Sequence, residues 1–229
     1  MQWNRTSVIV GIVAVVAVIF AGIAVWNYTH QDPYKGLVTS IEVQSDPEIV
    51  QLMEQRLATT KASIAALEAR GEVVDLDLYL SVANDAMVLG DLITAREAIE
   101  KQLDGNPLNY TAWNFYGSVL ELMTDYEGAE DAYLRAIYSG AAIEEFYRDY
   151  IVLLERRYPE RTADRFAMLE RSVEEQGATQ WNMVMLGRYY KDQKDCAAMS
   201  AHYDNAERLA PENVEIANEH RDAKGACRE

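Results

Sequence analysis

The stretch from Trp113 to Ala136 carries large and small side chains at helical spacing. Gly117 follows Trp113 by four residues, and Ala129 and Ala136 stand on either side of Tyr133. Steps of three, four and seven residues place side chains on one face of an α-helix. We therefore expect two helices, with Tyr133 filling the gap between the two small residues of the second. Gly117 is predicted to lie where the helices approach closely, because any side chain there would push them apart.

Related patterns recur along the chain with a period of about 34 residues. Together with the Trp113–Ala136 pattern, they make the chain similar to the tetratricopeptide-repeat (TPR) family. The resemblance implies an all-α fold, in which a right-handed α-solenoid of about four helix pairs lies between capping helices. The strongest match is 110–143 and 144–177 is degenerate. The predicted repeats span 76–109, 110–143, 144–177 and 180–213, and the predicted capping helices span 46–71 and 213–225.

The helix predicted over 46–71 has a clear start at Asp46 and Glu48, which suit the cap and the first turn. An apolar stripe follows from Ile49 to Leu67 at three- and four-residue steps. Such a stripe is typical of a helix that packs on a neighbouring repeat, and it also fits a short coiled coil that dimerises the protein. We expect the capping role, with the coiled coil as the alternative.

Residues 7–26 contain no charged side chain. About twenty residues at roughly 1.5 Å each match a hydrocarbon core of about 30 Å, which predicts a single transmembrane helix after a short N-terminus at 1–6. A cleaved signal peptide is the alternative, although its apolar core is usually only about 7–15 residues long. Residues 27–45 form a predicted linker.

Arg5 is the one charged side chain before the predicted span, and Lys35 beyond it stands close to Asp32. The positive-inside tendency then places residues 1–6 in the cytoplasm. The predicted location is a single-pass inner (cell) membrane protein with its TPR domain on the extracytoplasmic, periplasmic face. A formal net charge of −16 argues against nucleic acid as a partner.

The two cysteines of the chain, Cys196 and Cys227, are predicted to form a disulfide. Cys196 begins the second helix of the last repeat, and Cys227 follows the terminal helix. Because these helices should run antiparallel, the two cysteines lie at the same end. The bond is expected in an exported domain, and two unpaired thiols are the alternative.

A zinc site built from Cys196, His202, His220 and Cys227 is not expected. Six residues turn a helix by about 600°, so Cys196 and His202 face different directions. His220 and Cys227 share a face but lie about 10 Å apart along the axis, too far for one ion. No metal and no cofactor are predicted.

The sequence contains no phosphate-binding glycine loop with a lysine, no HExxH and no GxSxG, so we expect no catalytic activity. The TPR resemblance instead implies a concave groove, lined by the first helix of each repeat, that binds a protein or an extended peptide segment. A homo-oligomer or a larger membrane complex also fits this layout. The candidate groove residues are Asn84, Met87, Thr111, Asn114, Ser118, Glu121, Arg148 and Arg188.

An N-terminal anchor followed by repeats is similar in layout to two kinds of bacterial membrane protein. One attends the protein-export channel and its periplasmic chaperones, and the other presents apocytochromes during cytochrome c maturation. The leading prediction is a membrane-tethered scaffold for protein–protein interaction, accessory to protein export or envelope-complex assembly. The alternatives are a permanent structural subunit of a membrane or appendage complex and an apocytochrome-presenting factor.

Overall fold

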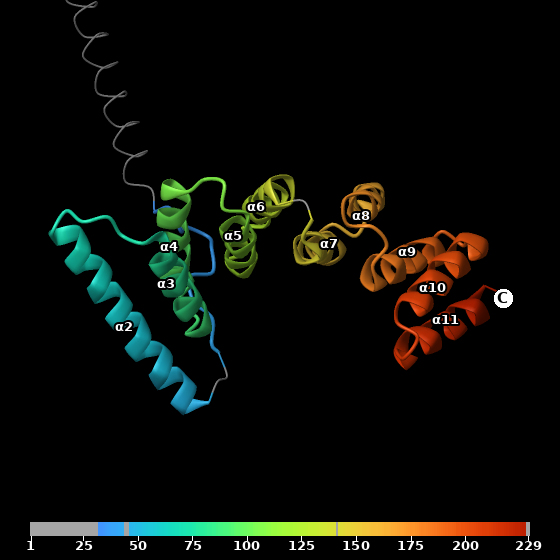
Figure 1. Cartoon of the computed structure of the whole chain (residues 1–229), viewed down its shortest axis with the longest axis horizontal. Coiled ribbons are helices and arrows are strands. Elements are labelled where there is room, and N and C mark those ends of the chain that lie inside the picture. The colour runs from blue at the N-terminus through green and yellow to red at the C-terminus, as the bar shows by residue number, and fades with distance from the viewer. Residues whose placement is uncertain (1–31, 44–45, 141, 228–229) are drawn as a thin grey trace, which may run out of the picture. The chain divides into compact units, whose positions relative to one another are not determined.

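The computed structural model describes residues 32–43, 46–140 and 142–227. The chain divides into two compact units, 1–37 and 38–229. In the first, residues 32–37 form a turn in which the Tyr34 amide donates to Asp32 Oδ1 at 2.9 Å. In the described part of the second, the regular secondary structure is helical, apart from one isolated bridge between Ser40 and Asp91 (Figure 1).

Successive helices of the second unit pack against each other in chain order. A long first helix is followed by four pairs and a closing helix (Figure 1). The bounds are α2 Pro47–Ala69, α3 Leu76–Val88, α4 Leu92–Gly105, α5 Tyr110–Leu122, α6 Tyr126–Ser139, α7 Glu144–Arg157, α8 Thr162–Gln176, α9 Gln180–Asp192, α10 Cys196–Leu209 and α11 Val214–Ala226.

The turn inside three of the pairs has the same two features, a residue with positive φ and a side-chain cap. The residue directly before the capping aspartate, Gly90, Thr124 or Lys194, has a positive φ. An aspartate then caps the second helix, because its carboxylate accepts from the amide of the third helical residue, as Asp125 does from Gly128 at 3.0 Å. Asp91 and Asp195 cap α4 and α10 in the same way.

The third pair, α7 and α8, lacks this turn. Pro159 stands where the repeat period would place the capping aspartate, and α8 begins after Arg161 with no side-chain cap. Only Leu169 and Ser172 of α8 are buried. The sequence stretch with the weakest repeat pattern therefore forms a helix pair with a different turn and a small buried face.

The predicted close approach at Gly117 is confirmed. A β-carbon on residue 117 would lie 2.6 Å from Cδ1 of Tyr133, and one on Gly187 would lie 2.7 Å from Cε2 of Tyr203. Both tyrosines are almost fully buried. In these two pairs the glycine on the first helix makes room for the ring on the second helix, so the helices pack closely.

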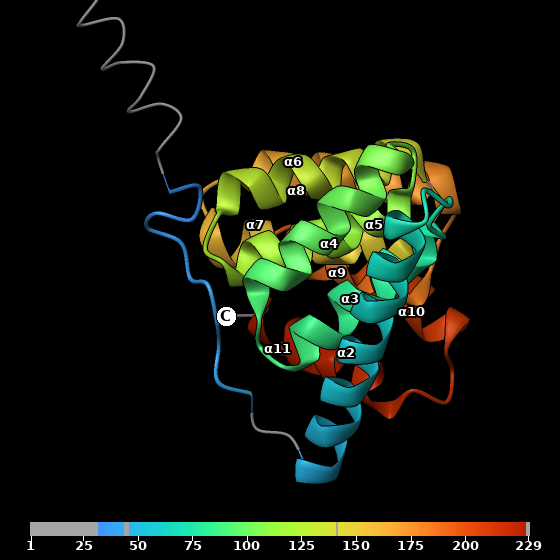
Figure 2. The same cartoon turned by 90° about the vertical axis from the view of Figure 1, so that its left-hand side faces the viewer.

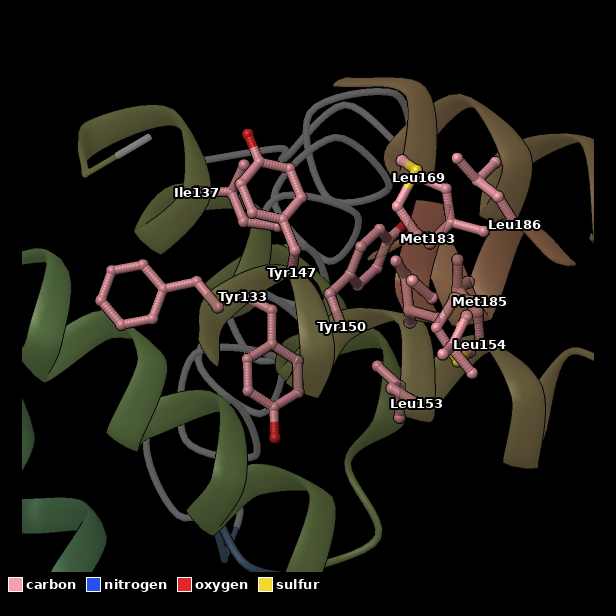
Figure 3. Packing of buried hydrophobic residues seen from close by; sticks show 14 of the residues in the cluster. Tyr133, Ile137, Tyr147, Tyr150, Leu153, Leu154, Leu169, Met183, Met185 and Leu186 are labelled. Carbon is pink, nitrogen blue, oxygen red and sulfur yellow. The ribbon is translucent and has the colours of Figure 1, made fainter. Parts of the chain in front are cut away.

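The buried core continues from α5 to α11, and Figure 3 shows part of it around Tyr133, Tyr147 and Tyr150. Each of these phenols reaches a carboxylate at the edge of the core; Tyr150, for example, donates to Glu130 Oε1 at 2.8 Å. Burial raises the pKa of Tyr147 to about 12, so its hydroxyl remains a donor. Tyrosine thus fills the interior without leaving a buried hydroxyl unsatisfied.

Helix α2 lies against α3, and Ile64 is its one buried residue. Arg56 Nε donates to Asp85 Oδ2 at 2.7 Å, which fixes α2 to a carboxylate buried on α3. Ile49 and Leu52, near the start of α2, are about half exposed, at 49% and 56%. This placement agrees with a capping helix, and the coiled-coil alternative stays a prediction.

Residues 38–43, part of the predicted linker, form backbone hydrogen bonds with the repeats; Figure 2 shows this segment in blue. The Val38 amide donates to the Met123 carbonyl at 2.9 Å, in the turn between α5 and α6. At the turn between α3 and α4, the Ile41 amide donates to the Gly90 carbonyl at 3.0 Å. The Leu92 amide donates in return to the Thr39 carbonyl at 3.2 Å. Residues 38–43 therefore lie across the turns of the first two helix pairs. The predictions for 1–6, 7–26 and 27–31 fall outside the described residues, and none of the helices described is both long and apolar enough to cross a membrane.

Candidate functional site

The first helices of three successive pairs, α3, α5 and α7, line one hollow of about 440 Å³. Five of the eight predicted groove residues, Asn84, Met87, Thr111, Asn114 and Ser118, lie in its wall. Leu80, Phe115, Glu145, Phe146 and Asp149 complete the wall. The helical spacing of these residues on α3 and α5 places them on the same face, which explains why the period located them.

A second hollow of about 340 Å³ adjoins the first, because Ser118 and Asp149 line both. It contains Glu121, the sixth predicted groove residue, whose Oε2 lies 3.3 Å from the hydroxyl of Tyr133. Arg156 Nη1 lies 3.9 Å from Glu121 Oε1, and the arginine side chain is 68% exposed. A long, exposed pair of this kind is worth little in water.

Arg148 and Arg188 lie elsewhere, in a hollow of about 350 Å³ lined by α7, α9 and α11. Arg148 Nη2 donates to Glu144 Oε1 at 2.6 Å, and its guanidinium lies 5.6 Å from the centroid of the Trp181 ring. The structure therefore divides the eight predicted residues between two regions, six in the adjoining hollows of the N-terminal half and two here.

Arg188 forms hydrogen bonds with another residue of the same chain. Its Nε and Nη2 atoms donate to the two carboxylate oxygens of Glu219 at 2.7 and 2.8 Å, and Tyr203 donates to the same carboxylate at 2.6 Å. The hydrogen bond from Arg188 holds the pKa of Glu219 below its usual value. This arginine joins α9 to α11, so its main contact is with the closing helix.

A hydrogen bond joins two residues of the wall of the first hollow, Asn114 on α5 and Asp149 on α7. Nδ2 of Asn114 donates to Oδ2 of Asp149 at 2.8 Å, and Asn114 is only 7% exposed. A carboxylate can only accept, so the amide nitrogen must face Asp149. The carbonyl Oδ1 of Asn114 is then left buried without a hydrogen-bond partner.

Asp149 is half-buried, and its surroundings disfavour its charge. Burial is the largest cause and raises the pKa of this carboxyl above its usual value, and the negative charges of Glu145 and Glu121 raise it further. The hydrogen bond from Asn114 and the charge of Arg148 act in the opposite direction. The negative charge of the Asp149 carboxylate is therefore only partly balanced by other groups of the protein.

Sequence reasoning did not select Asp149 or Phe146. The usual groove positions of the repeat give Glu145, Arg148 and Val152 on this helix. Asp149 follows Glu145 by four residues and precedes Val152 by three, so the same helical spacing places it on the groove face. That spacing could have identified Asp149, but its pairing with Asn114 depends on how α5 and α7 pack.

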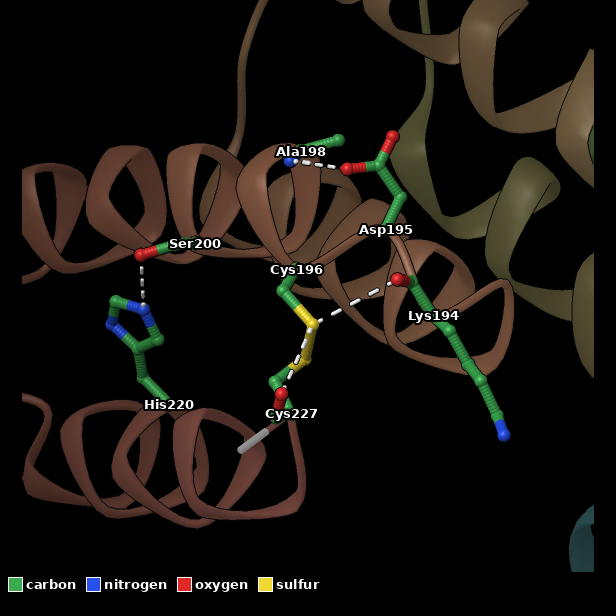
Figure 4. The surroundings of a disulfide bond; sticks show 7 residues. All are labelled: Lys194, Asp195, Cys196, Ala198, Ser200, His220 and Cys227. Carbon is green, nitrogen blue, oxygen red and sulfur yellow. Dashed lines mark hydrogen bonds between the residues drawn. A yellow bond between two sulfur atoms is a disulfide. The ribbon is translucent and has the colours of Figure 1, made fainter. Parts of the chain in front are cut away.

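At the other end of the chain, Cys196 and Cys227 form the predicted disulfide, with their Cα atoms 5.9 Å apart (Figure 4). The bond joins the start of α10 to the end of α11. Between these helices His220 is buried, with Nδ1 2.7 Å from Glu207 Oε1 and Nε2 3.1 Å from Ser200 Oγ. Both cysteines are used by the disulfide, so neither offers a thiolate to a metal.

One group of possible metal ligands lies between α10 and α11. Single ligand atoms of Asp204, Glu207 and His220 all lie within 4.8 Å of one another. Internal partners already occupy them, since His220 Nδ1 faces Glu207 and Lys224 Nζ lies 3.8 Å from Asp204 Oδ1. His202, the other histidine considered, stacks on Tyr190 with ring centroids 5.2 Å apart. The arrangement gives His220 a structural role in holding α11 on α10.

Several solved structures share this arrangement of helix pairs. The C-terminal part of a TPR repeat-containing protein from Cytophaga hutchinsonii matches with a TM-score of 0.61 and 14% identity, over 77% of this chain and 70% of that one. The chain has the tetratricopeptide-repeat fold. No family model matches the sequence, and no curated protein is significantly similar to it.

Two further solved structures are similar in fold to this chain. YrrB, described as a TPR protein with an unusual peptide-binding site, matches with a TM-score of 0.51 and 18% identity, over 70% of this chain and 85% of that one. PilW, described as a widely conserved type IV pilus biogenesis factor, matches with a TM-score of 0.51 and 17% identity, over 66% of this chain and 70% of that one. At these identities the likeness concerns the fold.

Proposed function

We propose that this protein is a membrane-tethered TPR scaffold that binds an extended segment of a partner protein in the hollow lined by α3, α5 and α7 and in the hollow that adjoins it. The observation that carries the proposal is the convergence of polar side chains from three successive repeats on one hollow, where Asn114 donates a hydrogen bond to Asp149. The exposed amide, hydroxyl and carboxylate groups of Asn84, Thr111 and Glu145 suit the backbone and side chains of an extended peptide.

The proposed setting is the extracytoplasmic face of the cell membrane, with residues 7–26 as the anchor. Two features support it. The apolar length of 7–26 suits a bilayer, and a structural disulfide between Cys196 and Cys227 is typical of an oxidising compartment. In this setting the scaffold serves protein export or the assembly of an envelope complex.

Photo-cross-linking in membranes tests the proposal. A photoreactive amino acid replaces Thr111, which is exposed in the wall of the hollow, and in a matched variant it replaces Glu127, which is exposed on α6. We expect adducts from position 111 that map, by mass spectrometry, to one contiguous segment of a partner. Equal adducts from both positions, or adducts scattered over a folded surface, would count against a peptide groove. Partners found only in the cytosol would overturn the proposed orientation.

A second candidate function is a permanent structural subunit of an envelope or appendage complex. The observation that favours it is the similarity in fold to PilW, a pilus biogenesis factor by its description. Mild solubilisation followed by native mass measurement separates the two functions. A stoichiometric complex that survives dilution would support the structural subunit, whereas rapid exchange of the partner would support the scaffold.

A further inference from the structure

The wall of the hollow lined by α3, α5 and α7 contains acidic side chains whose charge no basic side chain of the wall balances. Its lining contains two carboxylates, Glu145 and Asp149, and no lysine or arginine. The nearby Arg148 is engaged by Glu144 at 2.6 Å, and the exposed Arg156 lies near Glu121. In the described part of the chain, no basic side chain forms an ion pair with Asp149.

Asp149 and Asn114, which both line the hollow, need hydrogen-bond donors. Asp149 receives one, from Asn114, and the carbonyl Oδ1 of Asn114 receives none. Lysine brings three donors and arginine five, and neither brings an acceptor. A neutral amide or hydroxyl would also bring lone pairs toward the carboxylates, so a cationic group suits this set of acceptors best.

The rest of the wall suits the stem of a long side chain. Leu80, Met87 and Phe146 supply apolar surface from α3 and α7. Lysine and arginine place their methylene groups along such surface while their charged ends reach a polar partner. A volume of about 440 Å³ lies within the usual range for binding pockets, roughly 300–1,000 Å³, and accommodates one such side chain.

We infer that this hollow is a specificity pocket for a cationic side chain, in which Asp149 and Asn114 bind the ammonium or guanidinium group of a lysine or arginine in the partner's segment. The inference rests on the proposed function, because it names the residue type that a peptide-binding scaffold would select. A cation here also offsets the repulsion among Asp149, Glu145 and Glu121, so binding removes an unfavourable feature of the free protein.

A peptide array tests the inference with the full-length protein in detergent, its disulfide intact. The probes are immobilised random decapeptides with one fixed central residue, which is lysine, arginine, glutamine, norleucine or glutamate. We expect lysine and arginine probes to bind at least about tenfold more tightly than norleucine probes, with glutamate weakest. The Asp149→Asn variant should lose most of this preference while still binding peptides.

Asp222→Asn is the matched control, because it removes the same charge from an exposed position on α11. It should keep the preference for lysine and arginine. Equal loss in both variants would show that diffuse negative charge attracts the probes, and would overturn the pocket. Asp149→Asn retains an acceptor for Asn114, and thermal unfolding followed by circular dichroism verifies that it folds.

The outcomes separate the two proposals. Binding of all probes with equal strength would leave the peptide-binding scaffold intact and overturn the cationic pocket. Failure of the wild-type protein to bind any probe above the level of a Thr111→Trp variant, in which a bulky ring obstructs the hollow, would count against the scaffold itself. A preference for cations that depends on Asp149 would support both.

Discussion

Gly117 and Tyr133 contact each other so closely that a β-carbon on residue 117 would lie 2.6 Å from the tyrosine ring. The ring is almost fully buried, and its hydroxyl lies 3.3 Å from both Ser118 and Glu121 at the edge of the second hollow. Close packing of α5 on α6 therefore also positions polar groups of the candidate site. The packing of this helix pair and the geometry of the candidate site therefore depend on the same contact.

Gly117→Ala should destabilise the protein. Alanine gains about 1 kcal/mol of helix propensity, but forcing a methyl group against the ring costs roughly 1–3 kcal/mol, so a net loss of up to about 2 kcal/mol is expected. Urea unfolding of both proteins measures it. Gly225→Ala is the control, since a β-carbon there meets nothing within 4 Å. If the two variants were equally stable, the close contact would have no energetic importance.

Gly90→Ala should release residues 38–43 from the repeat turns. Gly90 has φ +77°, and an added β-carbon would lie 2.1 Å from the Ile41 carbonyl oxygen. Gly71 has a similar φ of +66° with open space around it, so Gly71→Ala measures only the backbone cost, roughly 1 kcal/mol. We expect faster hydrogen exchange at the Ile41 amide in Gly90→Ala alone. Unchanged exchange there would mean that the segment tolerates the clash.

Removal of the disulfide should loosen the closing helix. The bond spans 31 residues, and a loop of that length stabilises a folded chain by roughly 3–4 kcal/mol in the chain-entropy model. The double variant Cys196→Ser, Cys227→Ser should therefore exchange amide hydrogens faster in α11, with little change in α5. Protein isolated under non-reducing conditions should migrate faster on electrophoresis than reduced protein. Two reactive thiols in the native protein would contradict the assignment.

Glu130→Gln should reduce stability and flatten its dependence on acid. Arg161 donates to both carboxylate oxygens of Glu130 at 2.8 Å, which holds the pKa of Glu130 below its usual value. A lowered pKa contributes stability above the unfolded value of about 4.3 and loses it as pH falls through the folded value. We expect a loss of roughly 1–2 kcal/mol at pH 7 that begins to shrink near pH 4 and vanishes once pH has fallen below the lowered folded pKa of Glu130. Parallel unfolding curves for the two proteins across this range would refute the prediction.

The position of the Glu130–Arg161 pair explains why the third helix pair holds together. Arg161 precedes α8, the helix without a capping aspartate, and Tyr150 of α7 donates to the same carboxylate of α6. Long-range ion pairing thus joins three helices where the local turn signal is missing. Weak repeat identity in sequence does not imply that the helix pair is absent, because distant contacts can replace a local cap.

Local signals explain what was predictable. Helix starts depend on capping residues such as Asp91 and Asp125, and apolar periodicity places residues on a face, so the helices and the face that carries Asn84, Asn114 and Ser118 could be read from the chain. The docking of residues 38–43 had no such signal. It depends on backbone hydrogen bonds to the turns at Gly90 and Met123, which any side chains in an extended segment allow.

The all-α class, the repeat period, the close approach at Gly117 and the shared end of the two cysteines follow from the amino-acid sequence, because each depends on spacing along one or two helices. Which candidate groove residues lie together depends on tertiary packing. Asn114 and Asp149 meet because α5 packs beside α7, whereas Arg148 and Arg188 face another hollow and are held by internal carboxylates. Helix packing sets such distances between residues far apart in the chain, and no single helix contains that information.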